Sequence, residues 1–232
     1  MTSESVAPSS QTTWPILAVL LGQVRPFRGD DEPSAIGKLP VAHSVDVGPM
    51  GLAGDEQADR TVHGGIDKAI HHYPADHYAW WRQHLGNVPL LDAPGAFGEN
   101  ISTNGLDETT VCLGDRFRLG TALIEVSQAR QPCWKLDHRF ATKGVMAAVV
   151  KTRRTGWYYR VLETGQVQAG DALDLVERRY PEWPLASLFG LLIGGEAKDR
   201  RSDLRALREV PVLAKTWQVR RAKLAEQYGA DD

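Results

Sequence analysis

Short apolar stretches separated by glycine and proline dominate the chain up to about residue 176. Residues 16–21 are all apolar and predict a buried strand, and residues 44–47 predict a short strand that ends at Gly48. The segment between these strands is rich in proline, glycine and aspartate, which is typical of a loop. The rest of this region predicts further short strands.

Two of these segments share one turn chemistry. CLGDRFRL at residues 112–119 and QAGDALDL at residues 168–175 both place a Gly-Asp turn before alternating apolar and polar residues. A small β-barrel spaces its hairpins in this way. Two helices interrupt the strands, at residues 75–85 and 145–152, so we expect a mainly β (α+β) fold in which helices flank a barrel.

The pattern becomes helical after Pro181. Three helices are predicted there, at residues 185–193, 202–210 and 212–228, and the last carries apolar residues at near-helical spacing. These helices could cap the barrel, or they could bind a partner or a second copy of the chain, so the oligomeric state stays open.

These patterns divide the chain into three parts. Residues 1–13 are polar and rich in Ser and Thr, and predict a disordered lead. Residues 14–180 predict the barrel domain, and residues 181–232 predict a small three-helix domain.

Composition narrows the class of protein. The 232 residues are 42% hydrophobic and 24% charged, as in an ordinary soluble protein, and the longest apolar runs are too short to span a bilayer. The net charge of −2 gives no bulk attraction to nucleic acid or to an anionic membrane. The first 13 residues do not form a secretory signal. We therefore expect a cytoplasmic protein without a nucleic-acid or membrane partner.

The chain has only two cysteines, which excludes an iron–sulfur cluster or a zinc ion held by four thiolates. Cys112 lies in the strand pattern TTVCL, where a thiol usually packs as a small apolar group. Cys133 follows a strand pattern and a proline, and the end of a strand is a place where functional residues collect. A disulfide between the two remains open, although no secretory segment favours it.

Three groups of residues before Cys133 carry candidate chemistry. The first group follows Gly54-Asp55, and its two adjacent glycines let the backbone approach an anion closely and present N–H donors; it consists of Arg60, His63, Gly64, Gly65 and Lys68. The second group is a loop that enters a strand and offers a carboxylate and an amide; it consists of Gly98, Glu99 and Asn100. The third is Arg130, three residues before Cys133, a planar bidentate partner for phosphate or oxo groups.

The combination of these motifs resembles a known family. GLAGDEQADRTVHGGIDKAI (residues 51–70), FGENISTNGL (97–106) and CLGDRFRLGTALIEVSQARQPCWKL (112–136) resemble the signature segments of the MOSC domain, named for the molybdenum cofactor sulfurase C-terminal region. The chain is similar in particular to the bacterial YiiM-type subgroup, in which a small three-helix domain follows the barrel. The resemblance covers nearly everything beyond Trp14.

The resemblance implies a barrel that holds the molybdenum cofactor, molybdopterin, with Cys133 as the protein ligand to molybdenum and hence the central catalytic residue. A thiolate is a soft donor that suits such a metal. The other roles that it implies are as follows: Arg60, His63 and Lys68, with the amides of Gly64 and Gly65, hold the pterin phosphate or oxo ligands; Arg130 neutralises charge beside the metal; Glu99 and Asn100, in the loop that begins at Gly98, orient cofactor or substrate; and Trp134 forms an apolar wall for a flat base.

The reaction implied by the resemblance is the reduction of N-hydroxylated compounds, namely hydroxylaminopurine-type base analogues, amidoximes and hydroxylamines, with release of water. The sequence contains no G-x-G-x-x-G motif after a strand and no ferredoxin spacing of cysteines. We therefore expect a separate flavin- or iron–sulfur-containing electron donor as a partner.

Two other functions stay open at this stage. The protein could be a carrier that binds the cofactor without turnover, or a sulfur-transfer protein with a persulfide on Cys133. It could also be a metal- or thiol-dependent hydrolase, in which Cys133 acts with one of four histidines, His63, His71, His72 or His77. The sequence contains no H-E-x-x-H motif, and the adjacent His71 and His72 would point to opposite faces of a strand.

Overall fold

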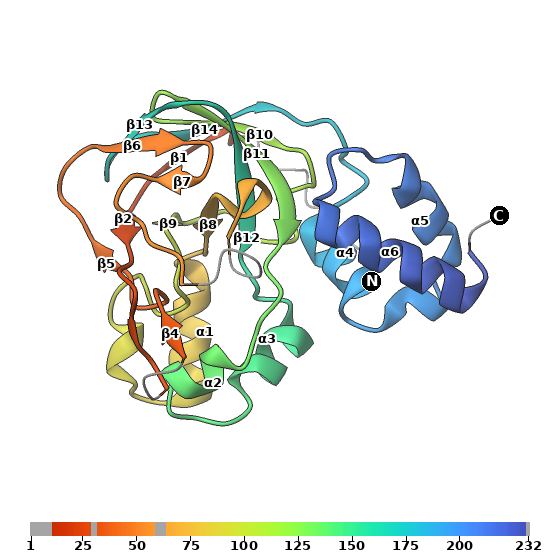
Figure 1. Ribbon diagram of the computed structural model, residues 1–232, viewed down its shortest axis with the longest axis horizontal. Coiled ribbons are helices and arrows are strands. Elements are labelled where there is room, and N and C mark those ends of the chain that lie inside the picture. The colour runs from red at the N-terminus through yellow and green to blue at the C-terminus, as the bar shows by residue number, and fades with distance from the viewer. Residues whose placement is uncertain (1–10, 29–31, 59–63, 231–232) are drawn as a thin grey trace, which may run out of the picture.

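The architecture is a curled β-sheet with helices on one side and a second group of helices beside its middle strands (Figure 1). The structure is a computed structural model and describes residues 11–28, 32–58 and 64–230. In this part of the chain the main sheet has nine strands, in the order β1 (Thr13–Pro15), β14 (Ala172–Glu177), β10 (Arg116–Leu119), β11 (Ala122–Ala129), β12 (Trp157–Glu163), β8 (Ile70–His72), β9 (Ile101–Ser102), β2 (Ala18–Leu21) and β5 (Leu39–Pro40).

Neighbouring strands of this sheet are antiparallel except β8 and β9, which run parallel with His72 opposite Ile101. Two smaller sheets complete the β structure, one formed by β13 (Gly165–Val167), β6 (Val45–Gly48) and β7 (Gly51–Leu52), and one by β3 (Arg25–Pro26) and β4 (Pro33–Ser34). Because the sheet curls, the apolar faces of β10 and β11 turn inward and are fully buried. The predicted mainly β (α+β) barrel fold is confirmed.

Helices flank the sheet on one side. They are α1 (Asp76–Leu85), α2 (Lys135–Arg139) and α3 (Val145–Thr152), with the 3-10 turn η2 (Pro89–Leu91). The buried faces of these four elements enclose an aromatic cluster in which the rings of Tyr73 and Phe97 stack with centroids 4.1 Å apart. This cluster supports the loop that carries residues 97–100. The 3-10 turn η1 (Ile66–Lys68) lies elsewhere, against β12.

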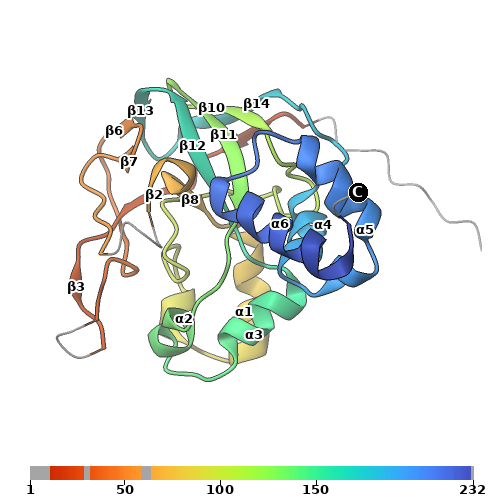
Figure 2. The ribbon, with the colours of Figure 1, turned by 45° about the vertical axis from the view of Figure 1, so that its right-hand side comes forward.

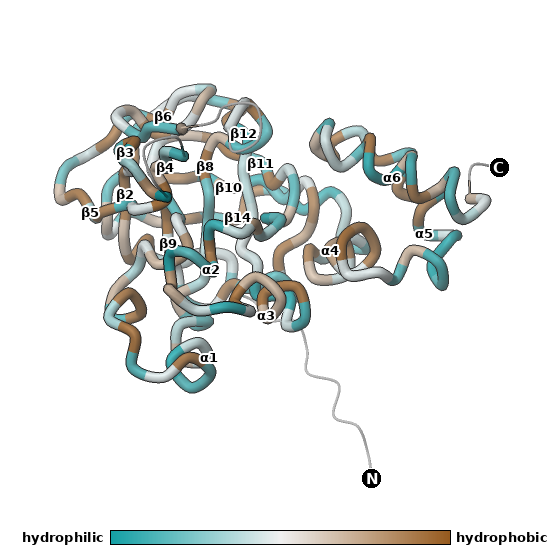
Figure 3. The backbone as a smooth tube through the Cα atoms, turned by 60° about the horizontal axis from the view of Figure 1, so that its bottom comes forward, coloured by the Kyte–Doolittle hydropathy of each residue, from teal (hydrophilic) through white to brown (hydrophobic). Residues whose placement is uncertain are grey.

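The C-terminal helices lie beside β11 and β12 (Figure 2). They are α4 (Leu185–Leu192), α5 (Arg201–Ala206) and α6 (Lys215–Tyr228), with the 3-10 turns η3 (Glu196–Lys198) and η4 (Leu207–Glu209). In Figure 3, α4 is mostly hydrophobic, which agrees with its burial, whereas α6 is mixed in character. The buried apolar cluster runs without a break from the inside of the sheet into these helices.

Several sequence expectations have direct counterparts. The helix predicted at residues 145–152 is α3, and the strand predicted at 16–21 is β2 at its C-terminal end. The last helix starts at Lys215 rather than at residue 212, because the backbone of residues 212–214 instead bonds to β11 and β12: Ala214 N–H donates to Ser127 O at 3.0 Å. Helix α2, directly after Cys133, was not expected.

The structure bears on two of the predicted boundaries, at residues 13 and 180. Most of the predicted disordered lead 1–13 lies outside the described residues, and Thr13 already pairs with Asp174 in the sheet. The division at residue 180 stays a prediction, since the described core is continuous across it. Among the described helices, none has the length and apolar character needed to cross a membrane.

Candidate functional site

A cavity lies where β11 ends, next to β8 and β12. Its empty space, with the open mouth included, is about 620 Å³. Among the described lining residues, basic side chains outnumber acidic ones four to two, so the cavity favours an anionic ligand. The lining residues that carry charge or could bind a metal are Lys38, Asp55, Glu56, Lys68, His71, Arg130, Cys133 and Lys135.

Cys133 reaches the cavity because the chain leaves the sheet just before it. Strand β11 ends at Ala129, the N–H of Arg130 still donates to Gly156 O at 2.9 Å, and Leu136 N–H then donates to Cys133 O at 3.1 Å at the start of α2. The Cys133 side chain is partly exposed and lines the cavity. The turn between β11 and α2 therefore presents the thiol to a ligand.

Cys112 has a different environment. It is buried away from the cavity, its Sγ lies 3.7 Å from Pro181 O, and burial raises its pKa to about 11. Both cysteines are free, so they do not form a disulfide. Cys133 is the reactive thiol candidate of the two.

Arg130 and His71 each contribute a buried nitrogen that has no partner among the described residues. Arg130 is only 5% exposed, and neither its Nη1 nor the Nε2 of His71 makes a hydrogen bond within that part of the chain. Burial lowers the pKa of His71 well below its usual value, and the charge of Arg130 lowers it further. Burial raises the pKa of Tyr158, whereas the charge of Arg130 acts in the opposite direction. Buried donors are usually satisfied, so the unpartnered Nη1 indicates that an acceptor belongs in this cavity.

A second buried cation, Lys38, was not singled out in the sequence. Its Nζ lies 2.5 Å from Asp55 Oδ2, and the Nδ2 of Asn100 donates to the same oxygen at 2.9 Å. Burial lowers the pKa of Lys38, and the charge of Asp55 opposes that shift. Lys38 lies in the proline- and glycine-rich segment that we interpreted as a loop, where no pattern marks a buried charge.

Asn100 lines the cavity, but its amide is committed to the protein. Its Oδ1 accepts a hydrogen bond from His71 N–H at 3.0 Å, and its Nδ2 also donates to Leu20 O at 3.2 Å. Asn100 thus ties β2, β8 and the Asp55 segment together. The structure gives it a role in positioning the wall of the cavity.

Glu99 also points into the protein rather than into the cavity. Its carboxylate accepts hydrogen bonds from Gly95 N–H at 2.6 Å, from Phe97 N–H at 3.1 Å and from the hydroxyl of Tyr78. The side chain is fully buried and is not among the lining residues. The expectation that Glu99 orients cofactor or substrate is not met in this geometry, because the carboxylate is used to hold the amides of its own loop.

Gly98 does line the cavity, and its position requires glycine. Its φ is +76°, and a Cβ atom there would lie 2.8 Å from Cγ1 of Ile36. The glycine therefore lets the loop of residues 97–100 pack closely against Ile36 in the cavity wall.

Only part of the glycine-rich motif lies within the described residues. Arg60 and His63 lie outside the described residues. Gly64 and Gly65 precede η1 and do not line the cavity, whereas Lys68, at the end of η1, does.

Trp134 follows Cys133 but does not form part of the cavity wall. It is 37% exposed, and the guanidinium of Arg28 lies 4.2 Å from the centre of its ring. Because Trp134 does not line the cavity, the geometry gives no support to the expected stacking of a flat base on its ring.

The histidines do not form a metal site in the described residues. His72 contacts Tyr159 Oη and Thr103 Oγ1 at 3.0 Å each, and His77 Nε2 lies 2.7 Å from Glu108 Oε2. Neither histidine lines the cavity. Within residues 11–28, 32–58 and 64–230, no three His, Cys, Asp or Glu side chains are grouped closely enough to hold a metal ion.

Comparisons with known proteins place this geometry in a family. The profile of the MOSC domain matches residues 59–174. The chain is 42% identical to protein YiiM of Escherichia coli (strain K12) over 160 residues, which are 69% of this chain and 71% of that protein. It is 38% identical to a protein named Reductase from Gibberella moniliformis over 175 residues, 75% of this chain but 31% of that protein. The crystal structure of YiiM from Geobacillus stearothermophilus superposes with a TM-score of 0.77 at 33% identity, covering 91% of this chain and 98% of that one.

Proposed function

The chain belongs to the MOSC domain family, and from that premise we propose that it is a molybdenum-cofactor-dependent reductase of N-hydroxylated compounds. The proposed substrates are hydroxylaminopurine-type base analogues, amidoximes and hydroxylamines. The observation that carries the proposal is Cys133, a partly exposed thiol on the wall of a cationic cavity. The name of the fungal relative, Reductase, supports the same reaction class.

The residues of the cavity fit the molybdenum cofactor. The cofactor needs a thiolate for the metal and donors for its phosphate and oxo groups, all of which are negative. Cys133 offers the thiolate, and Arg130 offers a buried Nη1 that has no partner among the described residues. Lys68 adds a further positive charge at the wall.

The residues of this chain would have the following roles. When bound, the molybdenum cofactor supplies the two electrons that break an N–O bond. Cys133 holds the metal, and Arg130 and Lys68 balance the negative charge. Gly98 lets its loop pack against Ile36 in the cavity wall, while Asn100 fixes the wall through its bonds to Asp55 and His71.

We further propose that the electrons come from a separate flavin- or iron–sulfur-containing protein, because the sequence carries neither type of motif. The substrate is a small molecule in this proposal, and neither nucleic acid nor a membrane takes part.

The test is an elemental and pterin analysis of anaerobically purified protein, followed by reduction of hydroxylaminopurine with reduced methyl viologen. We expect molybdenum and pterin in the protein, turnover with the chemical donor, and almost none with NAD(P)H alone. Cofactor without turnover of any N-hydroxylated compound would favour the carrier function, and cyanide-releasable sulfur on Cys133 would favour sulfur transfer. Hydrolysis of an ester or amide by protein that lacks molybdenum would overturn the proposal.

A further inference from the structure

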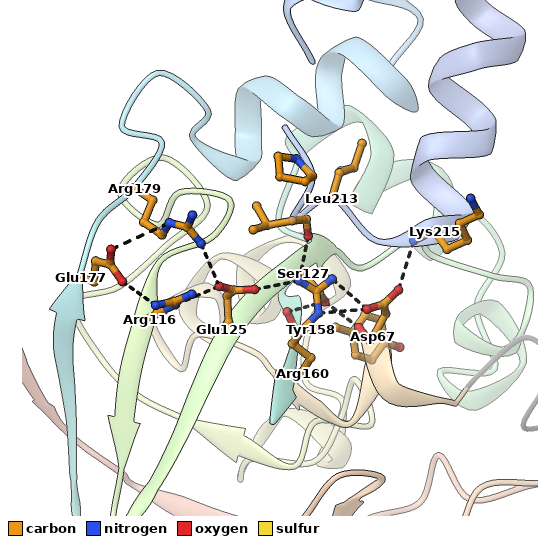
Figure 4. A network of polar contacts seen from close by, with 12 residues as sticks. Asp67, Arg116, Glu125, Ser127, Tyr158, Arg160, Glu177, Arg179, Leu213 and Lys215 are labelled. Carbon is orange, nitrogen blue, oxygen red and sulfur yellow. Dashed lines mark hydrogen bonds and ion pairs between the residues drawn. The ribbon is translucent and has the colours of Figure 1, made fainter. Parts of the chain in front are cut away.

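Asp67 lies next to Lys68 in η1 and is held by three other elements (Figure 4). Its Oδ1 forms an ion pair with Arg160 on β12, at 3.0 Å from Nε and 2.8 Å from Nη2. Its Oδ2 accepts a hydrogen bond from the N–H of Lys215 at 3.1 Å, and its carbonyl oxygen accepts one from Ser127 Oγ on β11 at 2.5 Å. Asp67 thus joins η1 to β11, β12 and the first residue of α6.

The contact with Lys215 matters because α6 has no cap of its own. Its N-cap residue is Ala214, which has no side-chain acceptor. The first N–H groups of a helix lack partners inside the helix, and a carboxylate near them is stabilising. Asp67, far away in the sequence, supplies that carboxylate, so α6 and η1 stabilise each other.

The chain just before α6 is fixed on the same two strands. Arg160 Nη1 donates to Val212 O at 2.9 Å and to Glu125 Oε1 at 2.8 Å, and Ala214 N–H donates to Ser127 O at 3.0 Å. Arg160 therefore contacts Asp67 and the start of α6 at once. A shift of α6 would disturb both contacts of the Asp67 carboxylate.

We propose that α6 positions the cavity wall: its first N–H and Arg160 together fix Asp67, and Asp67 fixes the neighbouring Lys68 at the cavity. Asp67 and Arg160 are positioning residues in this scheme. The C-terminal helices are then a working part of the site. The coupling is reciprocal, so a ligand that binds Lys68 in the cavity also stabilises the start of α6.

Lys215 allows a sharp test, because its side chain is exposed and only its N–H is used. Proline is well tolerated at the first position of a helix and has no N–H, and Ala214 already has the extended backbone (φ −54°, ψ 142°) that a residue before proline requires. Lys215→Pro therefore removes the bond to Asp67, while Lys215→Ala removes the side chain and keeps the bond. Comparing the two variants distinguishes the effect of the backbone N–H from the effect of the side chain.

The measurement is hydrogen exchange of the full chain at Lys68 and Ala69, whose amides donate to Gly65 O at 2.9 Å and to Tyr159 O at 3.0 Å. We expect these two amides to exchange about threefold to tenfold faster in Lys215→Pro, as loss of one hydrogen bond predicts, and at the wild-type rate in Lys215→Ala. Equal exchange in both variants and the wild type would overturn the coupling.

Asp67→Asn is a second variant, which tests the proposal even if Lys215→Pro disturbs the whole helix. We expect it to speed exchange both at Lys68 and in the first turn of α6, with helical content unchanged by circular dichroism. Faster exchange confined to Lys68 would contradict the proposal.

The link to the cofactor rests on the proposed function: pterin content should fall in Asp67→Asn and Lys215→Pro and stay unchanged in Lys215→Ala. Wild-type protein without pterin would refute the proposed function, while the exchange rates would still decide the coupling.

Discussion

The ammonium group of Lys38 and the carboxylate of Asp55 lie 2.5 Å apart in the wall of the cavity, with side chains only 9% and 3% exposed. Asp55 also accepts hydrogen bonds from Gly22 N–H at 2.7 Å and from Asn100 Nδ2 at 2.9 Å. Each of the two charges is thus buried with a partner of opposite sign. Such a pair is costly to break from one side, because the remaining charge stays buried.

We therefore expect Asp55→Asn to lower the free energy of unfolding by about 3–5 kcal/mol, measured by urea denaturation. Lys38→Met should cost less, since Asp55 keeps its two N–H donors. The control is Glu163→Gln, which removes an exposed ion pair with Arg118 and should change the free energy by less than about 1 kcal/mol. Equal effects of Asp55→Asn and Glu163→Gln on the free energy of unfolding would show that the buried pair contributes no more than an exposed one.

His72 makes stability depend on pH. Burial, and after it the charge of His77, lowers the pKa of His72 to about 3. The unfolded chain binds a proton at this residue below about pH 6.5, whereas the folded protein does not, so this contribution to stability is present above that pH and is lost as the pH falls toward 3.

We expect the loss in unfolding free energy between about pH 7.5 and about pH 5 to be smaller in His72→Gln than in the wild type by about 2 kcal/mol. Urea denaturation at the two pH values measures it. Equal losses in the two proteins would contradict the buried, neutral state of His72.

Local patterns in the sequence were enough for much of the fold. The Gly-Asp turns before β10 and β14 were visible because turn chemistry is local, and α3 could be delimited because its apolar residues and flanking glycine are local too. The start of α6 could not be located, because a distant strand competes for the backbone of residues 212–214. Helix α2 has only five residues, too few for a periodic pattern.

The residues of the candidate site could also be predicted only in part. Gly98, Asn100, Arg130 and Cys133 were predicted from motifs and do meet at one cavity. Lys38 could not be predicted, because sheet pairing brings it from a segment without periodicity. The carboxylate of Glu99 turns to the amides of its own loop, and the sequence could not show this because it does not reveal side-chain direction.

Arg130 carries a prediction that separates binding from stability. Its Nη1 is buried and has no partner in the described part of the chain, so Arg130→Met should leave the melting temperature of cofactor-free protein unchanged or raise it. The same variant should bind the cofactor about tenfold to a hundredfold more weakly, as expected for loss of a charge-assisted hydrogen bond. Calorimetry and pterin content measure the two effects. A variant that melts much earlier but keeps its pterin would assign Arg130 to folding instead.

Glu99 should behave in the opposite way. Glu99→Gln weakens the acceptor for the amides of Gly95 and Phe97 in a fully buried loop, and we expect it to cost about 1–3 kcal/mol of unfolding free energy. Cofactor bound per folded molecule should stay near the wild-type level, because the carboxylate does not face the cavity. Unchanged stability together with lost cofactor would show that Glu99 acts on the ligand.

The most direct test compares the two cysteines. Molybdenum and pterin are measured per chain in anaerobically purified wild type, Cys133→Ala and Cys112→Ala. Because Cys133 alone faces the cavity, Cys133→Ala should lose most of its molybdenum, with part of the pterin retained through the cationic wall, and Cys112→Ala should match the wild type. Wild-type molybdenum content in Cys133→Ala would contradict the assignment of Cys133 as the metal ligand.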